Sequence, residues 1–306
     1  KIDKQFASIF PTIHNFIKLY KKDSGDYKSL SYDLQRAESR LIYNKIIKKM
    51  MLLYPDIKVI FTIRDLRGIY LSFDRLSNTD IYRKYGDKCF CLAMHDSPNF
   101  AYKDNICTKF ICQPLMGPAE NSARKIIPIP LTMRHFEYEM IEDVFFIKEC
   151  RASDKVNNFC FTGQTGYANR DRIFNYSLPK FDKQKTKPIW HIKNKEERIK
   201  LNKNFCKRLS LSKFSFAPRG AGSSSFRLYQ SMMSGTIPIV SGMTDYPFQD
   251  EVSWDSICAR RITDPIDLLS INDNEYKKIR NNAINFWDQY VNIENCDKHL
   301  FNKYIK

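Results

Sequence analysis

A glycine- and serine-rich turn between a strand pattern and a helix pattern contains the densest group of residues suited to chemistry. Residues 213–217 alternate between polar and apolar side chains, and residues 226–234 have apolar side chains at helical spacing. The turn supplies glycines, serines and flanking arginines: Arg219, Gly220, Gly222, Ser223, Ser224, Ser225 and Arg227. A helix N-terminus offers free backbone N–H groups and partial positive charge, so this turn predicts a binding site for a phosphate or diphosphate.

Each residue type in this turn has a physical reason to bind an anion. Gly220 and Gly222 let the backbone approach a ligand closely, and the three serines add hydroxyl donors or cap the helix. Arg219 and Arg227 bring planar cations that can bond two phosphate oxygens at once. The turn is neither a Walker loop nor a GxGxxG motif. The alternative interpretation is a strand–helix–strand packing unit without a ligand.

Two other strand ends carry polar residues. Residues 158–163 read as a strand that leads through a polar turn into a helix at 171–176, which makes Arg170 a second candidate phosphate contact or else a surface arginine. Residues 88–94 read as an apolar strand, and His95 and Asp96 follow its carboxyl end, where ligands bind in open α/β sheets. The alternative for Asp96 is a helix cap.

The stretch 213–254 closely resembles the C-terminal signature of exostosin-type glycosyltransferases. The matching elements are, in order, Phe216, Pro218-Arg219-Gly220, Gly222, Ser225-Phe226-Arg227, residues 235–240, Pro247-Phe248 and Trp254. Gln230 stands where the family usually has Glu. The resemblance implies that this position accepts hydrogen bonds from a ribose diol, and Gln can still accept through its carbonyl but brings no charge.

Two earlier stretches extend this resemblance. Gly86, Asp87, His95 and Asp96 match a family motif, with Lys88 in place of a histidine. Residues 159–170 correspond to a Phe-x-Gly…Arg turn that opens the donor domain, which adds Gly163 and Arg170 to the implied donor site.

The resemblance implies an α/β protein of the GT-B type, with two Rossmann-like domains facing across a cleft. We place an acceptor-side domain at residues 1–152 and a nucleotide-sugar-binding domain at 153–290. A C-terminal tail at 291–306 is then expected to pack back on the first domain.

The implied reaction moves a sugar from a UDP-sugar donor to a hydroxyl of a glycan acceptor with inversion, as in a hexosyl- or pentosyltransferase. Asp96 is the first candidate for the catalytic base and His95 the second. Asp245 is expected to receive hydroxyls of the donor sugar, with Asp250 and Glu251 as alternatives. Because the chain has no Asp-x-Asp to hold a divalent ion, we expect a metal-independent enzyme without a cofactor.

Composition leaves other function classes open. Fifty Lys and Arg against 34 Asp and Glu give a net charge of +16, which favours an acidic partner. A protein that binds a polyanionic glycan or nucleic acid is therefore one alternative, although the basic residues are dispersed and no nucleic-acid motif is found, so nucleic acid is not expected. A GDP-sugar donor on the same fold is another, since the anion site selects diphosphate rather than base.

Cysteine usage bears on the compartment. The nine cysteines include no CxxC pair, and they favour reduced thiols and a cytoplasmic location. The alternative is the lumen of the secretory pathway, with an N-terminal anchor removed. No apolar run reaches the ~20 residues of a membrane span, and the oligomeric state is left open.

Overall fold

The chain divides into two compact units, Lys1–Val59 and Ile60–Lys306. The structure is a computed structural model, and it describes residues 59–63, 80–93, 102, 106–131, 144–166, 170–186, 192, 194–220, 222–260 and 262–305. All side chains described below belong to the second unit.

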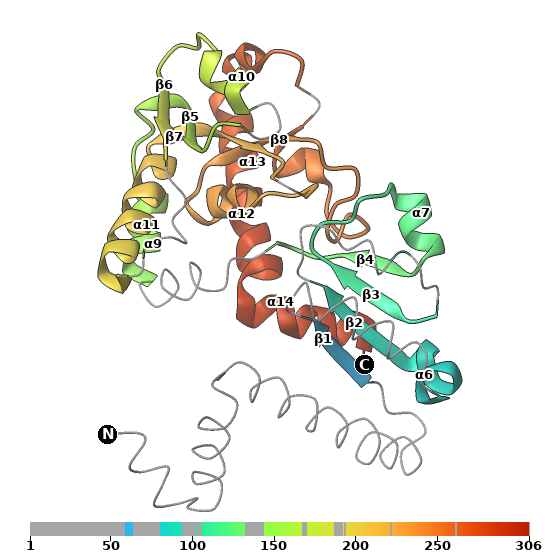
Figure 1. Cartoon of the computed structure of the whole chain (residues 1–306). Coiled ribbons are helices and arrows are strands. Elements are labelled where there is room, and N and C mark those ends of the chain that lie inside the picture. Colours follow the sequence, from blue (N-terminus) through green and yellow to red (C-terminus); the bar gives the residue numbers. More distant parts are fainter. Residues whose placement is uncertain are drawn as a thin grey trace, which may run out of the picture. The chain divides into compact units, whose positions relative to one another are not determined.

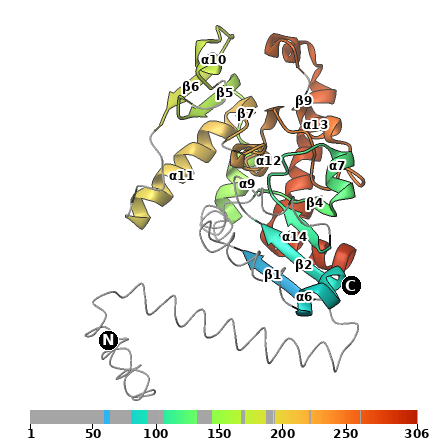
Figure 2. The same cartoon turned by 45° about the vertical axis from the view of Figure 1, so that its right-hand side comes forward.

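A four-stranded sheet is built from the first half of the described chain, in the order β1-β2-β3-β4 (Figures 1 and 2). Its strands are β1 (Val59–Ile63), β2 (Cys89–Ala93), β3 (Thr108–Ile111) and β4 (Ile126–Pro128). The pairs β2–β3 and β3–β4 are parallel. Three short helices accompany these strands: α6 (Asp80–Tyr85), the 3-10 turn η2 (Gly86–Lys88) and α7 (Pro118–Ala123). The strand predicted at 88–94 is thus confirmed, one residue shorter at each end.

A five-stranded sheet follows, in the order β6-β5-β7-β8-β9 (Figure 1). Its strands are β5 (Asn157–Gly163), β6 (Phe181–Lys185), β7 (Ser212–Pro218), β8 (Ile237–Ser241) and β9 (Ala259–Arg260). All four neighbouring pairs are parallel. The α/β class with parallel sheets is therefore confirmed, whereas two domains facing across a cleft, and their predicted boundaries, remain predictions.

Helices connect and follow the strands of the second sheet. They are α9 (Val144–Ala152), α10 (Arg170–Asn175), α11 (Lys195–Ser210), α12 (Phe226–Met233), η5 (Trp254–Ser256), η6 (Pro265–Ser270), α13 (Asp273–Phe286), η7 (Trp287–Val291), α14 (Ile293–Leu300) and η8 (Phe301–Ile305). Asn194 and Asn272 begin α11 and α13 by accepting hydrogen bonds from first-turn amides. None of the helices described has the length and apolar character that crossing a bilayer requires.

Three local predictions differ from the structure. β6 was not predicted because Phe181 is its single apolar residue, as suits a strand at the edge of the sheet. The apolar residues at 188–192 also favour a strand, but almost all of them lie outside the described residues. The apolar residues at 257–262 favour another strand, but only β9 forms, because the amides of Ile257 and Cys258 donate to the Trp254 carbonyl in a turn.

The third difference concerns residues 275–291, where apolar side chains at helical spacing favour one long helix. It is α-helical only to Phe286 and continues as the π-helical turn η7. Apolar spacing alone does not separate an α-helix from a π-helical extension, because both keep the same side buried across a single turn.

Two buried clusters hold the second sheet between helices. One contains the phenylalanines of β5 and β7 with residues of β8 and α13: Phe159, Phe161, Phe214, Phe216, Ile237, Ile239 and Tyr276. The other contains the buried side of α12 together with α13, η7 and residues of the first sheet: Leu228, Tyr229, Met232, Met233, Phe286, Trp287, Phe90 and Phe110. Ile239 and its neighbour Val240 belong to different clusters, as expected for side chains that alternate across a strand. Each large side chain buried here contributes about 1.5–3 kcal/mol.

The C-terminal segment contacts β3 and the turn that follows β8. The Tyr304 ring lies edge-on to Phe110 of β3, with ring centroids 5.6 Å apart. Lys303 pairs with Asp250 and Glu251, and His299 bonds to Glu251 at 3.1 Å. These contacts tie α14 and η8 to the turn after Pro247.

Lys155 yields a prediction about stability and pH. Its ammonium donates to the Ser210 carbonyl at the end of α11, and burial beside Arg280 lowers its pKa to about 7. Since the unfolded chain has a lysine pKa near 10.4, the folded protein binds fewer protons between about pH 7 and 10. Stability contributed by this site is therefore lowest at and below pH 7 and rises with pH.

We expect Lys155→Met to stabilise the protein by on the order of 2 kcal/mol at pH 6.5, with the advantage shrinking towards pH 10. Urea unfolding of both proteins across this pH range measures the difference. If the difference in unfolding free energy between the wild type and Lys155→Met does not change with pH, the pKa of Lys155 is not lowered in the folded protein.

Candidate functional site

The carboxyl ends of three neighbouring parallel strands place the predicted residues at one edge of the second sheet. β5 ends at Gly163, β7 ends at Pro218 and β8 ends at Ser241, and Pro218 pairs with Ser241. Arg219 and Gly242 follow β7 and β8 directly, so they lie at the same edge as Gly163. This is the edge at which open α/β sheets bind ligands.

Arg227 lies in the first turn of α12 and is half-buried at this edge. The guanidinium carbon is 5.0 Å from the centre of the Phe161 ring, which is a cation–π contact. Its Nε is buried and has no hydrogen-bond partner within the described residues. Burial, and then the charge of Arg170, lower the pKa of Arg227 to about 9. No carboxylate in the described part of the chain pairs with Arg227.

Gly163 makes room for this guanidinium. An added methyl carbon at Gly163 would lie 2.8 Å from Nη2 of Arg227 and 3.2 Å from the Phe161 ring. The Arg227 guanidinium can therefore lie against the end of β5 only because residue 163 has no side chain. This contact places Gly163 and Arg227 in one site.

Arg170 and Arg219 bring two more guanidinium groups to the same edge. Arg170 begins α10, and its Nη2 lies 3.5 Å from the Arg219 carbonyl oxygen, next to Gly220. The stem of Arg219 passes Gly242, where an added methyl carbon would lie 3.1 Å from Cδ. Arg219 is exposed at this edge.

The turn before α12 is held by the segment that follows β3. Gly220 N–H donates to the Ser224 carbonyl at 3.2 Å, which closes the turn on itself. Gly222 packs on Gln113 so closely that an added methyl carbon would lie 2.0 Å from its Oε1. The Ser223 hydroxyl donates to the Pro114 carbonyl at 2.7 Å. Only glycine at position 222 allows this close packing, whereas a methyl group could be added at Gly220 without a clash.

The three serines are buried rather than displayed. Ser223 bonds inside the protein, and Ser224 is 1% exposed. Ser225 is the N-cap residue of α12, but its hydroxyl makes no capping bond, so the prediction of a side-chain cap is wrong. Because a helix cannot satisfy its own first amides, the amides of Phe226 and Arg227 are the donors that this helix end offers to a ligand. A direct phosphate bond from a serine hydroxyl remains a prediction.

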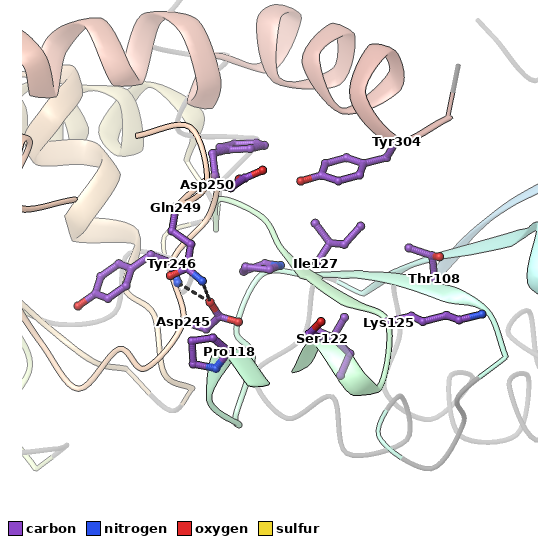
Figure 3. A pocket seen from close by; sticks show the side chains of 13 residues that line it. Thr108, Pro118, Ser122, Lys125, Ile127, Asp245, Tyr246, Gln249, Asp250 and Tyr304 are labelled. Atoms are coloured by element: carbon purple, nitrogen blue, oxygen red, sulfur yellow. Dashed lines mark hydrogen bonds between the residues drawn. The ribbon is translucent and has the colours of Figure 1, made fainter. Parts of the chain in front are cut away.

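Gln230 and Asp245 occupy different surroundings. Gln230 is half-buried one turn after Arg227, so the two lie on the same side of α12. Asp245 is 4% exposed and accepts hydrogen bonds from Gln249 and the Tyr246 amide at 2.7 and 3.1 Å (Figure 3). It also accepts a hydrogen bond from Asn121 at 2.9 Å. Burial raises the pKa of Asp245, although the hydrogen bonds from these three donors stabilise the carboxylate and act to lower it. The structure does not bring Asp245 into contact with the arginines.

The remaining candidates are paired elsewhere or not described. Asp250 and Glu251 form ion pairs with Lys303, whose bonds lower the pKa of both carboxyl groups despite their partial burial. His95 and Asp96 lie outside the described residues, so the structure does not test them as the catalytic base. Within the part of the chain that is described, no three acidic, His or Cys side chains lie close enough to hold a metal ion.

The arrangement can stabilise concentrated negative charge. Arg170, Arg219 and Arg227 lie at one sheet edge with the N-terminal amides of α12, and Arg227 has no anionic partner in the described chain. A diphosphate would replace mutual repulsion by charge-assisted hydrogen bonds.

Sequence reasoning missed two residues that shape this site. The Phe161 ring lies against the Arg227 guanidinium, and the Gln113 side chain packs against Gly222. Phe161 lies two residues before a predicted ligand-binding strand end, and Gln113 follows a strand of the first sheet, so the rule on strand ends could have drawn attention to both.

Comparison with known proteins agrees with the exostosin resemblance over part of the chain. The chain is 33% identical over 89 residues to the Exostosin-1 homolog of Caenorhabditis elegans. The match covers 27% of this chain and 23% of that relative, so it spans less than a quarter of the relative's length. No protein-family model matches. Over the matched residues the chain is therefore exostosin-like.

Gly163→Ala tests the fit between β5 and Arg227. The new methyl group would displace the end of a flexible side chain rather than backbone, so the fold should persist while the guanidinium moves. We expect the affinity for UDP, measured by calorimetry, to fall about tenfold, which corresponds to ~1.4 kcal/mol.

The matched control is Gly117→Ala, because an added methyl carbon there meets nothing within 4 Å. Equal affinities of the Gly163→Ala protein and the control would contradict a role for the Arg227 position in binding.

Proposed function

We propose that this protein is a glycosyltransferase that transfers a sugar from a nucleoside-diphosphate sugar, most simply a UDP-sugar, to a hydroxyl of a glycan acceptor. The observation that carries the proposal is the half-buried Arg227, whose Nε is buried without a hydrogen-bond partner in the described chain. Its guanidinium is repelled by Arg170 and pairs with no carboxylate of the described chain. The partial likeness to an exostosin homologue supports the same reaction class.

The arginine cluster suits the departure of a nucleotide. When the bond to the sugar breaks, negative charge develops on the diphosphate, and preorganised donors in a water-poor site stabilise that charge strongly. Arg227 and the first amides of α12 would contact the phosphate oxygens, Arg170 and Arg219 would add charge, and the Gln230 carbonyl would accept from the ribose. Since fixed cations can supply this stabilisation, we propose that the reaction needs no metal ion or cofactor.

The remaining elements of the proposal follow from the resemblance. The second sheet would belong to the donor domain of a GT-B enzyme, the first to the acceptor domain, and Asp96 or His95 would remove the proton of the attacking hydroxyl with inversion. All nine cysteines are free and buried, which supports a proposed location in a reducing compartment such as the cytoplasm.

Substitution of Arg227 tests the donor site. Arg227→Ala should abolish turnover and weaken UDP binding about 10- to 100-fold, because charge-assisted bonds to the diphosphate are lost. Arg227→Met should lose affinity equally, and its unliganded form should be no less stable than the wild type, because an unpaired buried charge is removed. Calorimetry with UDP and GDP, together with thermal unfolding, measures both effects and identifies the preferred base.

The control is Arg172→Ala, which removes one exposed arginine of α10. It should bind UDP as the wild type does. If the Arg227 and Arg172 variants weaken binding equally, with a steep salt dependence and a preference for oligonucleotides, the protein is a polyanion binder instead.

Asp96→Asn tests the proposed base. The variant should lose turnover in a UDP-release assay with acceptor present, while its affinity for UDP stays close to that of the wild type, because the base acts on the acceptor hydroxyl. Normal turnover would move the role to His95 or another residue. The wild-type assay should also proceed in EDTA, and activity that is lost there and restored by manganese would contradict metal independence.

A further inference from the structure

We propose that a second pocket, formed by α7, β4, the turn 245–250 and the C-terminal segment, binds one hydroxyl-rich sugar ring. The pocket has a volume of about 320 Å³, and none of the three clustered arginines lines it (Figure 3). This inference rests on the proposed glycosyltransferase function. It assigns a site for the sugar, which the arginine cluster does not provide.

A buried carboxylate supplies the polar wall of this pocket. One oxygen of Asp245 accepts from Gln249 and the Tyr246 amide, and the other accepts from Asn121. Asn121 is itself fixed by donating to the Met116 carbonyl at 2.8 Å. Burying a carboxylate is costly, and here three donors hold it in one orientation against a cavity. A rotationally fixed carboxylate with a remaining lone pair is well suited to accept a hydrogen bond from a sugar hydroxyl.

Backbone strain at the same pocket is an independent observation. Among the described residues, three that are not glycine have a left-handed backbone, and two of these, Lys125 with φ 52° and Phe248 with φ 54°, line this pocket. Such conformations cost on the order of 1–3 kcal/mol each and are concentrated at ligand sites. One lies directly before β4 and the other in the turn 245–250, so two separate segments are constrained where they border the pocket.

Aromatic side chains complete the walls. Figure 3 shows the Tyr304 ring and the Asp245 carboxylate on different sides of the pocket. The Tyr304 ring is held by its contact with Phe110, and Tyr246 packs on Trp254 with ring centroids 4.6 Å apart. A sugar ring has apolar C–H faces and polar hydroxyl edges. Rings at the walls and a few fixed polar groups are the combination that such a ligand requires.

Charge separates this pocket from the arginine cluster. Asp245 and Asp250 line it, whereas the ammonium of Lys125 donates to the Ile106 carbonyl at 3.0 Å. The charge of Asp250 is compensated by Lys303, but the carboxylate of Asp245 has no cationic partner among its hydrogen bonds. It disfavours a diphosphate and does not disfavour a neutral sugar. The ring could belong to the donor or to the acceptor glycan, and both present the same hydroxyl chemistry.

Ser122→Trp blocks the pocket with little risk to the fold, because Ser122 is an exposed residue of α7 at its wall. Ala123→Trp is the matched control, since Ala123 is also exposed on α7 and does not line the pocket. The probes are UDP, UDP-glucose, UDP-N-acetylglucosamine and the disaccharides lactose, cellobiose, maltose and chitobiose. Binding to the full chain is followed by saturation-transfer NMR and calorimetry.

We expect at least one sugar probe to bind the wild type and the Ala123→Trp protein, and to bind the Ser122→Trp protein at least tenfold more weakly. Loss of affinity for a UDP-sugar but not for UDP assigns the pocket to the donor's sugar. Loss for a free disaccharide, with UDP and UDP-sugars unchanged, assigns it to the acceptor.

Asp245→Asn provides a second measure, and it should weaken the same probe while UDP binding is retained. Sugar binding that Ser122→Trp leaves unchanged, or no sugar binding by a wild type that binds UDP, overturns this inference alone. Absence of UDP binding by the wild type would instead overturn the proposed function.

Discussion

The repulsion between two neighbouring arginines at a sheet edge is the interaction on which the rest of the site depends. Burial and the charge of Arg170 both disfavour the protonated form of Arg227, and its contact with Phe161 offsets only about 0.5–2 kcal/mol of this cost. Isolated buried charges are normally paired. A fold that keeps an arginine here, and omits the side chain at Gly163 to accommodate it, is therefore suited to receive an anion from outside the described chain.

The position of this arginine is fixed by packing on both sides. Toward the second sheet, α12 buries Leu228, Tyr229 and Met232, which sets the direction in which its first turn faces. Toward the first sheet, the turn before α12 is held by Gln113 and the Pro114 carbonyl. Any shift of the segment after β3 would consequently move the N-terminus of α12. The two halves of the described chain are thus mechanically coupled at the point where the diphosphate is proposed to bind.

A second link joins the same two halves further along. Thr244 and Asn121 both donate to the Met116 carbonyl, and Asn121 also donates to Asp245. The turn that follows β8 is therefore tied to α7, and the C-terminal segment is tied to that turn through Lys303. The walls of the proposed sugar pocket therefore come from three separate stretches of sequence. The arginine cluster, in contrast, is built almost entirely on the second sheet.

Local signals in the sequence predicted the elements around the anion site well. The patterns of the sequence located β5, β7 and α12 to within one or two residues, because each is a strongly patterned segment. That Gly163 and Arg219 lie at one edge follows from the parallel pairing of β5 with β7 in the structure. The polar edge strand β6 and the two-residue β9 were not predictable in this way, since their pairing depends on neighbours rather than on their own pattern.

Contacts between distant residues were beyond the reach of sequence patterns. Nothing local in the chain indicates that Asn121 reaches Asp245, that Ser223 turns inward to Pro114, or that Tyr304 returns to Phe110. The three serines read as phosphate donors because of their composition, but the packing of the turn against the first sheet buries them. The arginines were interpretable from sequence because the chemistry of a guanidinium is the same wherever the backbone places it.

The most direct measurement is a crystal structure of the protein with UDP. We expect the diphosphate to lie at the N-terminus of α12, with its oxygens within hydrogen-bond distance of the Arg227 guanidinium and the first helical amides. A diphosphate bound elsewhere, with the Arg227 guanidinium still lacking an anionic partner, would contradict it.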